Sequence, residues 1–442
     1  MTNHPRASAM AIGLLLVLPV AAIAETRYVS LTGSDWVNPC LQASPCRTIG
    51  AAVAAAGDGD TIVIEPGLFV EAAPIVIDKP LTIEGAGAGQ TSVKPNTAVQ
   101  VFDVYNVDKP HYKVTIRSLE IHGGKEGITN SRTLTLEDVD VRDNLDAGII
   151  NGNYASIELR RVRAFGNQGP GFNNRPEGVA LVTGSGFFDN AGNPGGVQNG
   201  GILFMHTSYV ANNVGLQIAG IGNLGSMYLT NVTISGNVAS ETAGHSGGIA
   251  LVKGVAILTH VTIVNNSAAL SGGISTAGGG KVTLRNTIVA GNTSPQCRIA
   301  YNGIQIDGDI TGAGNLTSDS SCNLWPASGA DGGSGNLIGI DAGLLSLSDN
   351  GGGTLTHALL PGSAAIDAGY LQFCLKADQR GVVRPVDGDQ DGTARCDIGA
   401  YEYNFEVGGG SRDGRAYWHY RGHWFRNGPS NHRIRREPIR RE

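Results

Sequence analysis

The chain has 442 residues, of which 65 are glycine and only 16% are charged, and its formal net charge is −6. Glycine is about twice as frequent as in average globular proteins, which indicates many tight turns between short buried segments. Beyond the N-terminus no segment approaches the roughly 18 unbroken apolar residues of a spanning helix. We therefore expect a mature protein that is soluble or peripherally attached, without a transmembrane anchor.

Residues 1–24 have the pattern of an export signal. Arg6 precedes an apolar run, and Ala22, Ile23 and Ala24 form an A-x-A cleavage site. An uncleaved membrane anchor is the alternative, but the run of about 15 apolar residues is short for a span. The pattern predicts a secreted or cell-surface protein.

An alanine-rich segment follows the signal. Residues Arg47 to Ala56 favour a short helix, which the sequence GDGD at 57–60 ends. The next runs, TIVIEPG, PIVIDKP and LTIEGAG, are typical of strands. The open end of a repetitive stack needs a cap, and we expect this helix to provide it.

A ladder of asparagines dominates residues 114 to 292. Seven asparagines recur at spacings of 23, 23, 23, 24, 29 and 26 residues, and each closes a short β-rich run. They are Asn144, Asn167, Asn190, Asn213, Asn237, Asn266 and Asn292. A period of this size with a strand and a turn in each unit is the signature of a β-solenoid. Stacked turns of this kind would place each asparagine about 4.8 Å from the next.

Three apolar columns keep register with the ladder. The residues ten, eight and three positions before each asparagine are apolar in all seven units, as Leu134, Leu136 and Val141 are in the first. Apolar residues two apart suit a half-buried strand. The residue after the second column is always polar, as in Glu137 and Arg160, and there we expect a bend. The residue before each asparagine is Asp, Gly or Asn, which is turn chemistry.

These repeats carry a resemblance. Residues 25–345 resemble a right-handed parallel β-helix of the pectate-lyase-like superfamily, which implies a coil with three sheets in each turn. The expected fold class is thus all-β, a single-stranded right-handed parallel β-helix with an N-terminal helical cap.

Charged residues stack along the expected rungs. The register places Asp138 on Arg161 and Asp140 on Arg163. One interpretation is a set of salt bridges between rungs, each contributing about 0–1 kcal/mol when exposed. The alternative makes these four residues catalytic, because β-helix polysaccharide lyases combine a calcium-binding acidic cluster with a basic residue. A hydrolase would need a carboxyl with a raised pKa, and arginines nearby act against that.

Residues 346–405 carry a second resemblance. The blocks DNGGGTLTHALLPGSAAIDAG, DQRGVVRP and CDIGAYEY resemble the choice-of-anchor Q region of secreted bacterial β-helix proteins. This resemblance implies a surface or secreted protein, and it assigns no catalytic residue. No membrane span or sorting motif follows the blocks in this sequence.

The six cysteines form three neighbouring pairs in sequence. A rod keeps sequence neighbours close in space, so we expect the disulfides Cys40–Cys46, Cys297–Cys322 and Cys374–Cys396 in an oxidising compartment. A zinc site is the alternative, but there is no C-x-x-C pair and the histidines are scattered.

An acidic turn inside the last cysteine pair resembles a calcium loop. Asp387, Asp389 and Asp391 alternate before Gly392, as in D-x-D-x-D-G, and Asp397 lies one residue before the position of the usual glutamate. The prediction is a structural calcium site. A solvated acidic turn without a metal is the alternative.

The last segment, residues 406–442, is basic. It opens with a GGGS linker and continues with nine arginines, so we expect it to lack structure alone. An arginine-rich, aromatic segment suits an anionic surface, and for an exported protein we expect no nucleic acid. The combined prediction is a monomeric, non-catalytic protein that binds polysaccharide or the cell envelope. The alternatives are a lyase or hydrolase of acidic polysaccharides and a purely structural stalk.

Overall fold

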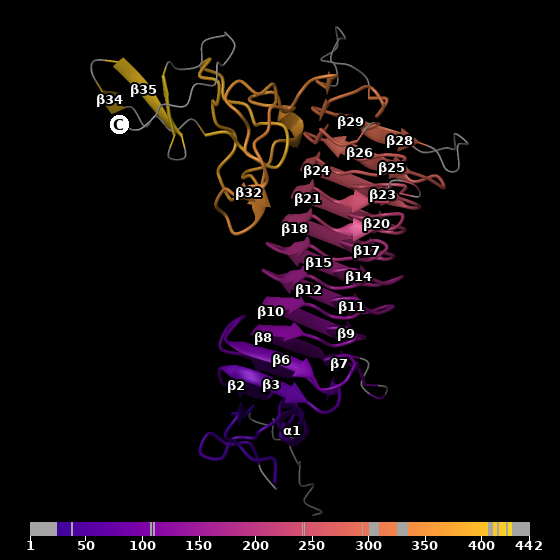
Figure 1. Ribbon diagram of the computed structural model, residues 1–442, viewed down its shortest axis with the longest axis vertical. Helices are drawn as coiled ribbons and strands as arrows, with labels where there is room; N and C mark the ends of the chain where they lie inside the picture. Colours follow the sequence, from indigo (N-terminus) through magenta and orange to yellow (C-terminus); the bar gives the residue numbers. More distant parts are fainter. Residues whose placement is uncertain are drawn as a thin grey trace, which may run out of the picture.

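The computed structural model describes residues 24–404, except 37–38, 107, 109–110, 241, 243, 294, 300–308 and 325–334, and the backbone of three strands between residues 410 and 426. The export signal predicted for residues 1–24 falls almost wholly outside the described residues. Within them the strands stack into a parallel β-solenoid along the long axis of the molecule (Figure 1). The all-β solenoid predicted from the repeats is confirmed.

Two parallel sheets form the wall of the solenoid. The larger one has 19 strands and is called the bent sheet below. Its strands are β1 (Thr26–Val29), β2 (Thr61–Ile64), β3 (Gly67–Glu71), β5 (Leu81–Glu84), β6 (Thr91–Pro95), β8 (Lys113–His122), β10 (Thr133–Arg142), β12 (Ser156–Arg160), β13 (Arg163–Phe165), β15 (Val179–Thr183), β16 (Gly186–Phe188), β18 (Ile202–Ala211), β21 (Ser226–Ser235), β24 (Val255–Val264), β26 (Lys281–Arg285), β27 (Ile288–Ala290), β29 (Asp309–Ala313), β30 (Leu316–Thr317) and β31 (Leu337–Ile338).

The smaller sheet has ten strands of three residues each and is called the flat sheet below. Its strands are β4 (Ile75–Ile77), β7 (Phe102–Val104), β9 (Ile128–Asn130), β11 (Ile149–Asn151), β14 (Phe172–Asn174), β17 (Val197–Asn199), β20 (Ile221–Asn223), β23 (Ile249–Leu251), β25 (Ile274–Thr276) and β28 (Cys297–Ile299). Each of these strands pairs in parallel with the equivalent strand of the next rung, so one turn of the coil separates neighbours.

Each long strand of the bent sheet folds over a single residue. In β10 that residue is Asp138 with φ 55°, and in the next rung it is Arg161 with φ 52°. The bend therefore lies one residue after the polar position that the sequence predicted, Glu137 or Arg160. The left-handed conformation turns the chain without breaking the ladder, and it divides the sheet into a first half before the bend and a second half after it.

The three apolar columns fill the interior. Leu134, Leu136 and Val141 are fully buried, and so are their equivalents Leu159 and Val182 in later rungs. The register Leu134↔Ile157 and Leu136↔Leu159 matches the alignment made from the sequence. Identical pairing on every rung stacks apolar side chains continuously, so the core runs along the whole solenoid.

The predicted asparagine ladder is continuous. The Nδ2 of each asparagine donates to the Oδ1 of the next, from Asn144 through Asn292, at 2.8–3.0 Å. The side chains are buried, and each Oδ1 also accepts the backbone N–H of the preceding ladder residue, as Asn167 does from Asn144. The residue before the asparagine is left-handed, as in Asp143 with φ 51° and Gly166 with φ 66°. The turn chemistry read from the sequence is confirmed.

A second asparagine ladder closes the flat sheet. It comprises Asn130, Asn151, Asn174, Asn199 and Asn223, joined by side-chain hydrogen bonds of 2.6–2.8 Å. All five are fully buried. The sequence analysis missed it, because these asparagines precede loops of different length and no constant turn motif marks them. The two ladders, one in the turn before each strand of the flat sheet and one at its end, satisfy the buried polar groups of these turns.

The predicted helix is present as α1 (Ile49–Ala55) and lies at the N-terminal end of the stack (Figure 1). The hydroxyl of Thr48 caps it by accepting from Ala51 N–H. The carboxylate of Glu71, in β3, accepts from Ile49 N–H at 2.8 Å and from Gly50 N–H at 3.2 Å. A buried acid at a helix N-terminus satisfies otherwise orphaned donors and fixes the helix on the first rungs.

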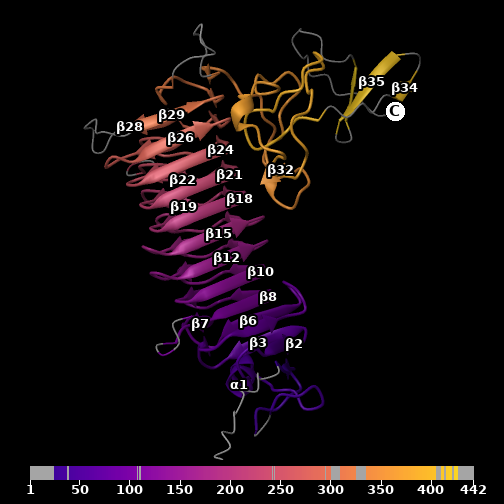
Figure 2. The same cartoon turned by 180° about the vertical axis from the view of Figure 1, so that it is seen from behind.

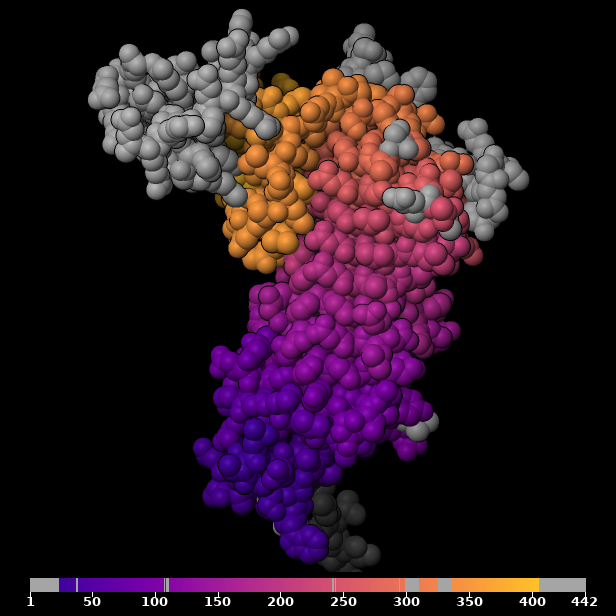
Figure 3. All heavy atoms as spheres, in the orientation of Figure 1, coloured from indigo at the N-terminus to yellow at the C-terminus, as the bar shows by residue number. Residues whose placement is uncertain are grey.

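Residues 349–403 fold back against the rod and are called the docked module below. They include η1 (Leu371–Phe373) and β33 (Leu355–Thr356), which pairs with β32 (Ser348–Asp349). Figures 1 and 2 show the module beside the upper rungs from both sides, and Figure 3 shows the same segment lying against the rod in space-filling form. It covers the second half of the bent sheet, where Ala400 N–H donates to Thr262 Oγ1 at 2.9 Å.

A buried ionic cluster organises the docked module. Arg384 is fully buried and donates to the backbone carbonyls of Asp397 and Gly399 at 3.0 and 2.8 Å, with Glu402 3.4 Å away. It also contacts His260 of strand β24. One guanidinium thus joins the second and third of the sequence blocks to each other and to the rod.

All three predicted disulfides, Cys40–Cys46, Cys297–Cys322 and Cys374–Cys396, are formed.

The basic tail was expected to lack structure alone. Its described backbone forms three antiparallel strands, β34 (Gly410–Arg412), β35 (Arg415–Tyr420) and β36 (His423–Arg426). Aromatic residues, which are frequent in β35 and β36, have high strand propensity.

The short strands β19 (Val214–Gly215) and β22 (Val238–Ala239) pair beside the first ladder. No helix among the described residues is long and apolar enough to cross a membrane.

Candidate functional site

The charged residues singled out from the sequence form ion pairs between rungs. Arg161 binds Asp138 through two hydrogen bonds of 2.6 and 2.8 Å and also reaches Glu137 at 2.8 Å. Arg163 binds Asp140 through two bonds of 2.8 and 2.5 Å. Both pairs have the bidentate geometry in which a guanidinium and a carboxylate fit best.

The electrostatics of these pairs oppose acid–base catalysis. The hydrogen bonds from Arg161, with its charge, hold the pKa of Asp138 below its usual value despite some burial. Burial works to raise the pKa of Glu120, but hydrogen bonds from Arg142 and Ser92 outweigh it and the pKa is lowered. Carboxylates held ionised in this way cannot donate a proton near neutral pH. The geometry therefore supports the salt-bridge interpretation of Asp138, Asp140, Arg161 and Arg163.

The acidic turn does gather carboxylates, but not the set predicted from the motif. Oxygen atoms of Asp367, Asp387 and Asp389 lie within 4.8 Å of one another. Asp391 instead accepts from Thr393 N–H, and Asp397 is buried in the module, where it accepts from Asp367 N–H at 2.8 Å. Asp391 and Asp397 therefore lie outside this group of carboxylates, because the turn packs against Asp367, which is 20 positions before Asp387 in the chain.

The oxygen set of this cluster suits a hard cation. One carboxylate oxygen of Asp387, Oδ1, is enclosed and has no hydrogen-bond partner among the described residues. Asp367 accepts from Gly388 N–H at 2.7 Å and from Asp389 N–H at 2.9 Å, which fixes its carboxylate beside the turn. Calcium takes oxygen ligands in flexible arrangements of six to eight, so these three residues would hold it with water completing the shell.

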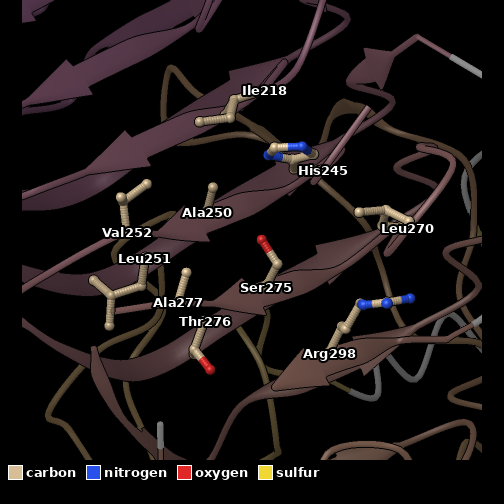
Figure 4. A pocket seen from close by; sticks show the side chains of 10 residues that line it. All are labelled: Ile218, His245, Ala250, Leu251, Val252, Leu270, Ser275, Thr276, Ala277 and Arg298. Atoms are coloured by element: carbon tan, nitrogen blue, oxygen red, sulfur yellow. The ribbon is translucent and has the colours of Figure 1, made fainter. Parts of the chain in front are cut away.

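A hollow on the outer face of the flat sheet is a separate candidate (Figure 4). Its volume is about 40 Å³, room for a few water-sized groups. Its lining consists of Ile218, His245, Ala250, Leu251, Val252, Leu270, Ser275, Thr276, Ala277 and Arg298. It is hereafter called the Arg298 hollow.

Small residues create this hollow. Outward-facing Gly222, Ala250 and Ser275 occupy equivalent positions on β20, β23 and β25, between Gln198 and Arg298 on the flanking strands. The longest interval in the asparagine ladder, 29 residues, adds chain just before β23. His245 lies in that added chain, and its backbone N–H donates to Gln217 O at 2.7 Å, which fixes the loop beside the sheet.

The polar groups of the hollow are mainly donors. Arg298 makes no ion pair with a described residue, and its enclosed Nε has no hydrogen-bond partner among them. Figure 4 shows the Ser275 hydroxyl pointing toward His245, while the guanidinium of Arg298 lies on the far side of the opening. The enclosed Thr276 hydroxyl also lacks a partner within the described chain. None of the described lining residues carries a carboxylate, so this part of the hollow favours an oxygen-rich or anionic group.

None of the sequence patterns predicts this site. His245 is one of the scattered histidines, and Arg298 belongs to no motif. The only signal in the sequence is indirect: three small residues at outward positions and one long repeat interval. Neither shows by itself that an added loop folds over those small residues.

No family model and no curated protein matches the chain. Three solved structures with similar chains are a pectate lyase, Pel9A, a complex of XylC with xylose, and the A-module of the Azotobacter vinelandii mannuronan C-5 epimerase AlgE4. The identities are 16%, 10% and 16%, and the TM-scores are 0.49, 0.47 and 0.36. The matches cover 86%, 85% and 59% of this chain, and 96%, 98% and 79% of theirs. The proposals below rest on this chain's own residues.

Proposed function

We propose that the protein is exported and binds acidic polysaccharide without turning it over, with the Arg298 hollow as a contact point. The observation that carries this proposal is a guanidinium with no ionic partner among the described residues, in a hollow that also holds a serine hydroxyl and an imidazole and whose described lining has no carboxylate. Arginine is well suited to carboxylate recognition because its planar fork donates two parallel hydrogen bonds.

The dimensions support an extended ligand. A hollow of about 40 Å³ accommodates a substituent such as a carboxylate but not a whole sugar ring. Apolar walls from Ile218, Val252 and Leu270 flank the polar groups and suit the C–H faces of sugar rings. A polymer lying along the flat sheet could place one substituent in the hollow and leave its remaining residues on the rod surface.

The absence of turnover is supported by the charged rungs. The carboxylates around Asp138 and Asp140 are neutralised by arginines, and the pKa of Asp138 is lowered by that contact. This arrangement stabilises the stack and provides no proton donor for glycoside hydrolysis, which needs a carboxyl with a raised pKa.

A lyase is the second candidate, and His245 favours it. The imidazole of His245, across the opening from Arg298, could take the proton alpha to a uronate carboxylate while the guanidinium binds that carboxylate. Elimination would then create a carbon–carbon double bond and break the bond to the glycosidic oxygen, which leaves as a hydroxyl after taking a proton from water. This candidate makes the same hollow an active site and differs from the first in having a product.

Export is supported by three disulfides within the described chain, which form and persist in oxidising compartments. The signal pattern of residues 1–24 and the resemblance of residues 346–405 to an anchoring region agree with this location. We further propose that the basic tail contributes electrostatic attachment at the envelope, since it opposes the acidic remainder of the chain.

Calcium belongs to the proposal as a structural ion. Asp367, Asp387 and Asp389 would hold it at the edge of the docked module. The ion would supply positive charge to a turn in which three carboxylates converge. Nothing in the Arg298 hollow depends on it.

The deciding experiment measures binding and turnover together. The purified protein would be incubated with polygalacturonate, alginate and neutral dextran, with binding followed by a retained-ligand assay and elimination by ultraviolet absorbance. The proposal expects retention of the acidic polymers, no new absorbance, and at least tenfold weaker binding by Arg298→Gln. Arg160→Gln, an exposed ion-paired arginine elsewhere on the rod, is the matched control. New absorbance lost in His245→Ala would establish the lyase instead, and equal binding by both arginine variants would reject the hollow.

A further inference from the structure

An apolar patch lies on the outer face of the first half of the bent sheet. Its members are Val179, Leu181, Ile202, Phe204, Tyr228, Val255 and Ile257, hereafter the apolar face. Val179, Leu181, Ile202, Phe204 and Val255 are 37–40% exposed, and Tyr228 and Ile257 are half-buried. Contiguous exposed apolar surface on a soluble protein marks an interaction site more often than isolated apolar residues do.

The strand register makes one column of this face continuous. Leu181, Phe204, Tyr228 and Ile257 are direct neighbours on four successive strands, β15, β18, β21 and β24. The adjacent column consists of Val179, Ile202, Ser226 and Val255, so a single serine interrupts its apolar residues. The docked module binds on the other side of the bend, through positions such as Thr233 and Thr262. The side chains of the apolar face therefore stay exposed while the module is bound.

The aromatic residues of the apolar face present their edges. The rings of Phe204 and Tyr228 stack on one another with centroids 4.9 Å apart and an interplanar angle of 13°. Their mutually facing surfaces are therefore occupied by each other. A sugar ring stacks on an exposed aromatic face, whereas ring edges between branched aliphatic side chains suit packing against another protein surface.

Charged residues flank the apolar face with opposite balance. Below it, Glu137, Asp138 and Glu158 outnumber their partners Arg160 and Arg161. Above it, Lys281 and Arg285 lie on β26, and neither forms an ion pair with a residue whose side chain the structure describes. Glu158 lies one strand below the patch, in the column of Leu181, and Lys281 lies one strand above it, in the column of Val255. The two charges are therefore equally many strands from the centre of the patch and two residues apart along the strand direction.

We propose that a second copy of this chain packs on the apolar face, antiparallel to the first. A two-fold axis along the strand direction, between β18 and β21, superposes the two patches on each other. It brings Glu158 of one copy to β26 of the other, near Lys281 of the partner subunit. A parallel pair would instead put like charges together at both rims.

The size of the face indicates a concentration-dependent dimer. Six strands and five residues per strand span about 24 Å by about 16 Å, so the contact is smaller than a standard interface of about 800 Å² per partner. Two flat sheets pack face to face about 10 Å apart, and side chains of both apolar faces would fill that space. This inference replaces the monomer expected from the sequence, and it does not depend on the polysaccharide proposal.

Sedimentation velocity of the full chain, over a wide range of protein concentration, tests the proposal. We expect a monomer–dimer equilibrium that Phe204→Glu shifts to monomer at every concentration, because the substituted carboxylate would be buried in the contact. Leu216→Glu is the control, since Leu216 is 63% exposed and lies outside the apolar face. Unchanged far-ultraviolet circular dichroism establishes that both variants fold. A wild-type chain that stays monomeric, or a dimer indifferent to Phe204→Glu, overturns the proposal.

Charge reversal tests the orientation. Glu158→Lys and Lys281→Glu should each weaken the dimer about tenfold, because like charges then meet at both rims. The double variant should regain the wild-type affinity, since an antiparallel dimer pairs position 158 with position 281. In one chain the two positions are five strands apart, about 24 Å, too far for an internal contact to produce the rescue. Failure of the double variant to recover rejects the antiparallel arrangement.

Discussion

The hydroxyl of Thr233 donates a 2.7 Å hydrogen bond to the side-chain oxygen of Gln379, which is 146 residues further along the chain. The amide nitrogen of the same glutamine donates to Thr354 Oγ1 at 3.0 Å and to Leu355 O at 2.9 Å. One buried side chain thus joins the rod to two segments of the docked module.

Replacing Gln379 with alanine should loosen the docked module. The change leaves buried donors and acceptors without partners, which costs about 1–3 kcal/mol for each group. We expect faster proteolysis within residues 349–403 while the rod resists, as measured by limited digestion and mass spectrometry. Gln198→Ala, on the outer face of the flat sheet, should leave the digestion pattern unchanged. Equal protection of Q379A and wild type would contradict the role of this contact.

Replacing an asparagine inside the ladder should destabilise the fold strongly. Asn190 donates to Asn213 Oδ1 and Ala164 O, each at 3.0 Å, and its own oxygen accepts from Asn167 at 2.8 and 3.1 Å. Asn190→Ala should therefore destabilise the fold by about 3 kcal/mol, because buried amide groups lose their partners. Urea unfolding measures this loss, with exposed Asn153→Ala as the control. If the loss of unfolding free energy is no larger than that of the control, water replaces the hydrogen bonds of the ladder asparagine.

The buried cluster predicts stability that depends on pH. Burial, followed by the nearby charge of Glu402, raises the pKa of Asp397 to about 8. Since the folded state then holds this proton more tightly than the unfolded state, stability is full at low pH and falls as pH rises from about 4 to about 8. Melting temperature across this range should fall more steeply in the wild type than in Asp397→Asn. Equal slopes of melting temperature against pH in the two proteins would show that a group other than Asp397 causes the pH dependence.

The sequence motif and the structure assign different calcium ligands in the acidic turn, and calcium binding by variants distinguishes them. Calcium should raise the melting temperature of the wild type, by the equivalent of about 2.7 kcal/mol when the free ion is about 100 times its dissociation constant. Asp387→Asn should abolish the rise, because this residue belongs to the convergent cluster. Asp391→Asn should retain it, although the D-x-D-x-D-G motif treats both residues alike. Loss of the rise in both variants would restore the motif's ligand set.

The repeat was readable from the sequence because its determinants are local. A left-handed residue such as Asp143 followed by a buried Asn144 recurs at nearly constant spacing, and the apolar columns recur with it. The second ladder, from Asn130 to Asn223, has the same chemistry but was missed. Its members are followed by turns of different composition, so alignment by the first ladder does not draw attention to them.

The sites depended on contacts that sequence spacing does not encode. Asp367 joins the acidic turn from an upstream block, and Asp397 leaves it because the module core needs its carboxylate for the backbone N–H groups of Asp367 and Tyr403. Arg298 and His245 share a hollow only because an added loop folds over small residues of the flat sheet. In each case the partner was chosen by packing between segments far apart in the chain.

The sequence by itself determined the β-solenoid, its rung register, its short N-terminal helix and its three disulfides. A coil of this kind stacks each residue on its equivalent in the next repeat, so a one-dimensional alignment already states which side chains touch. Only the tertiary structure decided where the docked module binds and which carboxylates converge. Those outcomes follow from surfaces meeting across the rod, where burial and hydrogen bonding act between residues that no repeat relates.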